Sequence, residues 1–192
     1  MPKIALFALA LIWAVIIVIT PVNSVQSQTI SQASQPITQE SITLKYQIMR
    51  ESLNDRSNRQ AAIAFLDSHV STKGRFIFHT HNTIAPTSEQ KQKFVLDKTR
   101  YIQSFIDGTN FIDNYSITID VHEVSIEEDG LQATSQETIT ERGIALNPFN
   151  MLEDGKAFIA ITTCTTRHVL QDDKAVSDTA DCRTTTSLEH LI

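Results

Sequence analysis

The chain has 192 residues, and 16 Lys and Arg against 22 Asp and Glu give it a formal net charge of −6 at pH 7. This acidic balance excludes the basic electrostatic footprint of a nucleic-acid-binding protein. The length suits one domain whose hydrophobic core needs no further support.

An apolar run dominates the N-terminus. Lys3 is the only charge before a stretch from 4 to 20, which Pro21 and small or polar residues follow. This is the layout of an export signal, so residues 1–24 are predicted to be a signal peptide. The run has about 17 residues, close to the shortest membrane span, so an uncleaved anchor is the alternative. In either case we expect a periplasmic or secreted domain, held at the inner membrane only if the segment stays uncleaved.

The next segment differs in composition from both of its neighbours. Residues 25–37 are rich in Gln and Ser and carry no charge. Such a segment has little to bury, and we interpret it as a flexible leader. Residues 38–192 then form the folded domain.

The two cysteines, Cys164 and Cys182, are an even pair in a chain that is predicted to be exported. Two strand-like stretches, FIAITTCTTRHV and TADCRTTTSL, flank the sequence QDDKA. A hairpin centred near Asp173 places the cysteines directly opposite each other, within reach of a disulfide. We therefore predict a disulfide, and two free buried thiols are the alternative.

Helical periodicity marks the start of the domain. Residues 38–53 carry apolar side chains at helical steps. A second helix is predicted to begin at a capping box formed by Ser57 and Gln60. Gly74 is interpreted as the stop signal after that helix.

A strand and a third helix are expected next. Phe76 and Phe78 alternate with other residues in a short strand. The third helix is predicted over 88–106, and it is introduced by a capping box of Thr87 and Gln90.

The second half of the domain has the pattern of strands. Apolar alternation runs through 116–126 and changes phase at His122-Glu123, which indicates a bulge or a bend. Asp129-Gly130 is a strong turn signal, and a partner strand returns after it. Two further strands complete four long antiparallel strands. The order of elements predicts an α+β fold in which three N-terminal helices pack on a curved antiparallel sheet.

This order of elements resembles the NTF2-like superfamily, also called SnoaL-like or cystatin-like. The resemblance is carried by FLDSHVSTKGRFIFHT, by the third helix running into DNYSITIDVHEVSIEEDGLQATSQETITE, and by the closing pair of strands, over about residues 38 to 190. The resemblance implies a cone, in which helices lie in the hollow of a bent sheet and leave a pocket. Members include isomerases, dehydratases, transport factors and periplasmic parts of secretion systems, so the fold alone does not imply an activity.

Two histidines in the stretch RFIFHTHNT raise the question of a metal site. His79 and His81 alternate with other residues, so they share one face of a strand about 7 Å apart. His122, Glu123 or His168 would have to complete the site. Zinc sites usually show closely spaced ligand pairs, and this is one pair only. We expect polar strand residues at the solvent side or at the cone mouth, with no metal and no cofactor.

No catalytic motif is present: the chain has no Gly-rich phosphate loop and no nucleophile elbow. Asp120, His122, Tyr46 and Tyr101 are the residues that could serve pocket chemistry, and Asp120 is expected to face water. We predict no catalytic residue. Tyr46, Phe78, Tyr101 and His122 are predicted to line the pocket.

These observations favour an exported, non-enzymatic domain that binds a small apolar ligand or a protein partner through its cone or its sheet face. One alternative is an isomerase or cyclase type of enzyme, which requires an acid or a base that points into the cone. Another is a VirB8-like, membrane-anchored component of a secretion system. Whether the protein is an enzyme stays open. The threonine-rich sheet would also suit a homodimer.

Overall fold

The computed structural model describes residues 35–82, 90–110, 112–145 and 157–189. The predicted signal or anchor, and most of the predicted leader, lie outside the described residues. Within those ranges no helix is long and apolar enough to cross a membrane.

Six strands form one sheet. Their bounds are β1 Val70–Asn82, β2 Gln90–Leu96, β3 Ile112–Ile126, β4 Gln132–Ala145, β5 Ala157–Gln171 and β6 Lys174–Glu189. The spatial order is β2-β1-β6-β5-β4-β3. Strands β3 to β6 pair in an antiparallel manner, as predicted. The expectation of a purely antiparallel sheet is wrong, because β1 pairs with β6 in parallel and carries β2 on its other edge.

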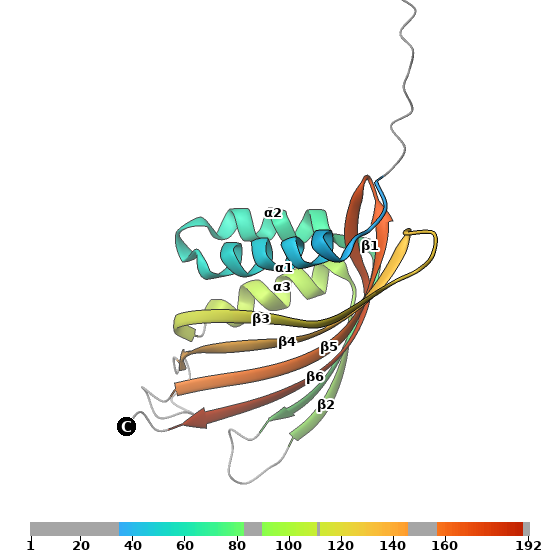
Figure 1. Cartoon of the computed structure of the whole chain (residues 1–192). Helices are drawn as coiled ribbons and strands as arrows, with labels where there is room; N and C mark the ends of the chain where they lie inside the picture. The colour runs from blue at the N-terminus through green and yellow to red at the C-terminus, as the bar shows by residue number, and fades with distance from the viewer. Residues whose placement is uncertain (1–34, 83–89, 111, 146–156, 190–192) are drawn as a thin grey trace, which may run out of the picture. The chain divides into compact units, whose positions relative to one another are not determined.

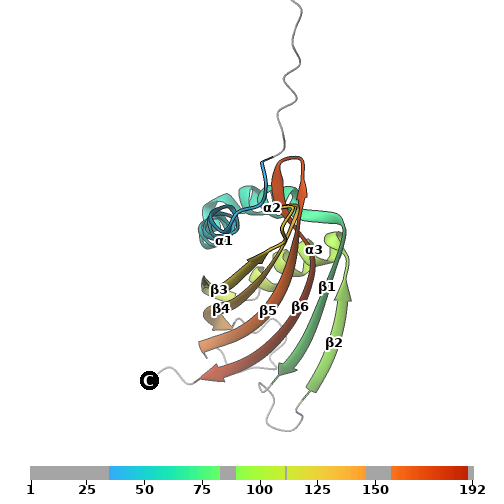
Figure 2. The ribbon, with the colours of Figure 1, turned by 45° about the vertical axis from the view of Figure 1, so that its right-hand side comes forward.

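Three helices lie on the concave face of the bent sheet (Figure 1). They are α1 Gln39–Asn54, α2 Arg59–His69 and α3 Lys98–Asn110. A view turned by 45° shows the same arrangement, with the long strands curving around the helices (Figure 2). The pairing of β3 with β4 shifts register between Val121 and Glu123, which confirms the predicted bulge.

The helix starts follow local capping chemistry. The Thr38 hydroxyl accepts a hydrogen bond from the Ser41 backbone N–H, and Ser41 reciprocates, which begins α1 at its predicted place. Asn58 caps α2, and its side chain accepts from the Ala61 N–H. The capping box that was predicted at Ser57 is therefore wrong. Gly74 is not a stop signal either, since α2 ends at His69 and Gly74 lies inside β1.

The third predicted helix is wrong in its first half. Residues 90–96 form the edge strand β2 instead of the first turns of a helix. Thr87 of the predicted capping box lies outside the described residues. The helix begins at Lys98, because the Asp97 carboxylate accepts from the Arg100 backbone N–H at 2.8 Å.

The core fills the space between the helices and the concave face. Apolar side chains of α1 and β3 dominate it, among them Ile42 and Ile117, which are almost completely buried. Ile37, the last residue of the predicted leader, belongs to this core, and its N–H donates to the Gly130 carbonyl at 2.8 Å. Gly130 has a φ of +66°, and a Cβ there would stand 2.5 Å from Pro36. The turn that was predicted from the Asp129-Gly130 pair thus needs its glycine.

The last two strands form the predicted hairpin. Asp172 and Asp173 both have positive φ and make its turn. Cys164 and Cys182 are directly opposite each other in the register and are joined by a disulfide.

Candidate functional site

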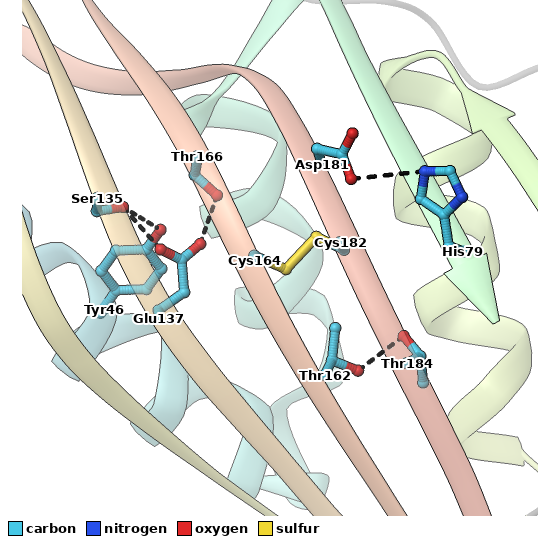
Figure 3. The surroundings of a disulfide bond; sticks show 10 residues. All are labelled: Tyr46, His79, Ser135, Glu137, Thr162, Cys164, Thr166, Asp181, Cys182 and Thr184. Carbon is cyan, nitrogen blue, oxygen red and sulfur yellow. Dashed lines mark hydrogen bonds and ion pairs between the residues drawn. A yellow bond between two sulfur atoms is a disulfide. The ribbon is translucent and has the colours of Figure 1, made fainter. Parts of the chain in front are cut away.

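A cavity of about 290 Å³ lies between the helices and the concave face of the sheet. Six aromatic residues contribute to its wall: Tyr46, Phe76, Phe78, Tyr101, Phe105 and Phe158. Polar groups also reach the cavity, and they are Ser104, Glu137, Glu141, Thr162, Thr166, Ser177 and Thr184. Cys164 and Cys182 also line the cavity. Figure 3 shows the disulfide between them, with the neighbouring side chains of Glu137, Thr166 and Thr162.

The structure brings together three of the four residues that were predicted to line the pocket. Tyr46, Phe78 and Tyr101 line the cavity. His122 is exposed and lies outside it, beside the Thr138 hydroxyl at 2.8 Å. His122 follows Val121, which packs against the core, so alternation along β3 puts the His122 side chain on the opposite face, away from the cavity.

Glu137 is a buried carboxylate at the cavity wall, with 3% of its surface exposed. The Ser135 hydroxyl donates to Glu137 Oε2 at 2.8 Å, and the Thr166 hydroxyl donates to Oε1 (Figure 3). Burial raises the pKa of Glu137, and these two donors and the Tyr46 hydroxyl oppose the rise.

Behind Glu137, a chain of hydrogen bonds continues into the core. Ser135 Oγ lies 2.8 Å from His168 Nε2, and His168 Nδ1 lies 3.1 Å from Lys45 Nζ. Because the Ser135 hydroxyl gives its proton to Glu137, it accepts from His168, which must carry its proton on Nε2. Lys45 then donates to the bare Nδ1 and also to Ser177 Oγ at 2.6 Å.

Burial lowers the pKa of both nitrogen bases in this series of hydrogen bonds, Lys45 and His168. It lowers the pKa of Lys45 from 10.5 to about 7, although the nearby Glu137 opposes the shift. It lowers the pKa of His168 to about 2, and the charge of Lys45 adds to this effect. His168 is therefore neutral at physiological pH, which agrees with its role as donor to Ser135 and acceptor from Lys45.

Glu141 is a second carboxylate in the same cavity. Its place on β4, four residues after Glu137, puts both side chains on one face of the strand, about 13 Å apart along the backbone. The Tyr115 hydroxyl donates to Glu141 Oε1 at 2.8 Å. Burial raises the pKa of Glu141.

Sequence reasoning missed both carboxylates, although a signal was present. In the stretch SQETITE, Ser135, Glu137 and Glu141 share the strand face of Ile139, which packs against the core. Acidic residues on the apolar side of a strand mark a candidate site. Sequence reasoning also missed Lys45, which lies on the buried face of α1 and is 6% exposed.

The two histidines of the first strand lie on the face opposite to Phe76 and Phe78. His79 Nε2 lies 3.5 Å from Asp181 Oδ1, and both side chains are largely exposed. Within the described ranges, no group of three or more His, Cys, Asp or Glu residues is placed to hold a metal ion. His168 is committed to the hydrogen-bonded chain described above. Asp120 is exposed, as expected.

Comparison with known proteins shows the fold. No family model matches the chain, and no curated protein does. A scytalone dehydratase-like protein from Novosphingobium aromaticivorans superposes with a TM-score of 0.52 at 12% identity, over 80% of this chain and 88% of the other. A conserved protein from Planctomyces limnophilus gives a TM-score of 0.53 at 9% identity, over 78% and 96%. An NTF2-like protein of unknown function from Shewanella oneidensis gives 0.45 at 7% identity, over 76% and 97%.

The two neighbours with TM-scores above 0.5 share the fold of this chain. This agrees with the predicted α+β class. At such low identity the similarity extends to the fold, while the function has to be argued from the cavity.

Proposed function

We propose that this protein is an exported domain that binds a small, mainly apolar molecule in the cavity on the concave face of its sheet. The observation that carries the proposal is the cavity itself: about 290 Å³, walled largely by aromatic and aliphatic side chains, with a few polar groups that converge on it. This composition is typical of small-molecule sites. The disulfide is compatible with a location outside the reducing cytoplasm.

A specific observation favours a second candidate, an enzyme of the isomerase or dehydratase type. Such an enzyme needs an acid or a base inside the pocket, and Glu137 is a buried carboxylate with a raised pKa, held in place by Ser135 and Thr166. One structural neighbour is named a dehydratase, and that activity is said of the neighbour only. The two candidates differ in one outcome: only the enzyme would exchange a carbon-bound hydrogen of its ligand with solvent.

The opposite face of the sheet supports a weaker proposal for protein contacts. It is rich in threonine, and Ile161 there is 48% exposed. This face could receive a second copy or another protein, as the secretion-system alternative requires. Exposure of one isoleucine is common on protein surfaces, so the cavity carries the main proposal.

Blocking the cavity tests the main proposal. Thr184 reaches the cavity from β6, where its hydroxyl pairs with that of Thr162 at 2.9 Å. In Thr184→Phe, the added ring enters this space, and we expect binding of the neutral apolar dye Nile red to fall about tenfold or more. Fluorescence titration measures the dissociation constant.

The matched control is Thr185→Phe, which adds the same ring to the exposed face of the same strand. We expect it to bind the dye like the unmodified protein, and circular dichroism should show that both variants are folded. Equal binding by Thr184→Phe and the unmodified protein would show that apolar molecules do not use this cavity.

A further inference from the structure

The charge of the cavity restricts the kind of ligand, if the cavity is the binding site proposed above. Glu137 and Glu141 are the ionisable acids in its wall, and none of its described lining residues is Lys, Arg or His. In their ionised form these two acids give the apolar cavity a negative potential, which opposes the entry of carboxylates and phosphates.

The two carboxylates differ in the hydrogen-bond donors and the positive charge that surround them. Glu137 accepts two hydroxyl hydrogen bonds, and the buried Lys45 stands behind it and favours its charge. Glu141 accepts one hydrogen bond, from Tyr115, and no described basic side chain forms an ion pair with it. Glu141 is partly buried, and an ionised carboxylate that is partly removed from water without a counterion is costly unless a cation approaches it. Glu141 is thus the group that a positively charged ligand would stabilise.

An aromatic wall stands in the same cavity. Phe76 and Tyr101 are stacked with their ring centroids 4.5 Å apart, and Phe78 continues the stack at 6.1 Å from Tyr101. Burial raises the pKa of Tyr101 to about 12, and the negative charges of Glu137 and Glu141 add to the rise. Both carboxylates line the same cavity as this ring. Aromatic faces attract cations, and the attraction grows when water is excluded.

We infer that the ligand is a small hydrophobic amine, bound as its ammonium ion between Glu141 and the aromatic wall of Phe76, Phe78 and Tyr101. The ammonium group supplies the charge that Glu141 lacks, and the apolar body fills the rest of the cavity. A neutral alcohol of the same shape would gain the apolar contacts and one hydrogen bond but would leave Glu141 without a counterion. A carboxylate of the same shape would be repelled.

Three matched probes test this inference on the full folded domain: 4-phenylbutan-1-amine, 4-phenylbutan-1-ol and 4-phenylbutanoate. They share the apolar body and differ in the charge of one end. Calorimetric titration at pH 7.5 should show the amine binding at least about tenfold more tightly than the alcohol, and the carboxylate binding more weakly than both.

Glu141→Gln separates charge from shape. The variant keeps an oxygen that can accept from Tyr115, so we expect it to fold normally. It should lose the preference for the amine, with an affinity for the alcohol that changes less than about threefold. Glu123→Gln removes an exposed carboxylate from β3 and is the matched control, which should keep the full preference.

The outcomes distinguish this inference from the proposal on which it rests. If the alcohol binds as tightly as the amine, or if Glu141→Gln keeps the preference for the amine, the inference is wrong while the cavity remains a binding site. If none of the three probes binds and Nile red binding is also indifferent to Thr184→Phe, both fail together.

Discussion

Lys45 and Glu137 are two buried ionisable residues whose pKa values are set by their surroundings. Neither has a direct ion-pair partner among the described residues, and they communicate through Ser135 and His168. In this series of hydrogen bonds every donor points at an acceptor. Polar groups can be buried without a large cost only when they are paired in this way. The chain connects two cavity-lining residues, Glu137 and Ser177, through the core.

The lowered pKa of Lys45 predicts how stability depends on pH. Between about pH 7 and 10.5 the unfolded lysine binds a proton that the folded one has lost, so the free energy of unfolding rises with pH in this window. From pH 7.5 to 9.5 this difference approaches one proton, which contributes about 2 kcal/mol.

Lys45→Met, which keeps the unbranched apolar stem of the side chain without its amino group, isolates this contribution. The variant should be less stable throughout, because His168 loses its donor, and it should lack the contribution of Lys45 to the rise. Urea unfolding at pH 7.5 and at pH 9.5 measures the difference. If the free energy of unfolding changes with pH by the same amount in the variant and the unmodified protein, the pKa of Lys45 is not lowered.

At the scale of elements, the hairpin of β5 and β6 was predictable and the strand β2 was not. The hairpin is specified by local sequence, since the turn residues, the alternation of buried and exposed side chains and the two cysteines all predict one register. In β2, the sequence KQKFVL suits either a helix or an edge strand. Its conformation is decided by β1, which offers an open edge, and by Asp97, which starts the next helix.

The disulfide is expected to stabilise this hairpin. Replacing both cysteines, as Cys164→Ala with Cys182→Ala, should lower the free energy of unfolding by about 3 kcal/mol for a loop of this length. Chemical denaturation of the purified protein measures the loss. Intact mass after alkylation, with and without reductant, gives the oxidation state, and two alkylatable thiols in the native protein would overturn the expected bond.

At the scale of the whole molecule, the sheet depends on contacts between distant parts of the chain. The parallel pairing of β1 with β6 joins the two ends of the domain and places Phe76 and Phe78 opposite Ala180 and Cys182. This pairing closes the cavity on the side of the aromatic wall. A purely antiparallel sheet of four strands would have lacked that wall.

Export is a prediction about the whole chain. We expect the mature protein to begin near Val25 or Gln28, because small residues that suit cleavage precede both positions. N-terminal sequencing of the protein after cell fractionation measures this. Retention of the first 24 residues in a membrane fraction would favour the anchored alternative over a cleaved signal.

Local patterns in the sequence determined the α+β class, the first two helices, the bulge near His122, the glycine turn at 130 and the pairing of the cysteines. Each of these depends on residues that are near one another along the chain or are brought together by one turn. The tertiary structure alone decided the parallel strand pair, the edge strand β2 and the site, because each depends on packing between distant segments. Glu137 and Glu141 become candidate site residues only because the helices and the bent sheet remove them from water beside an aromatic wall.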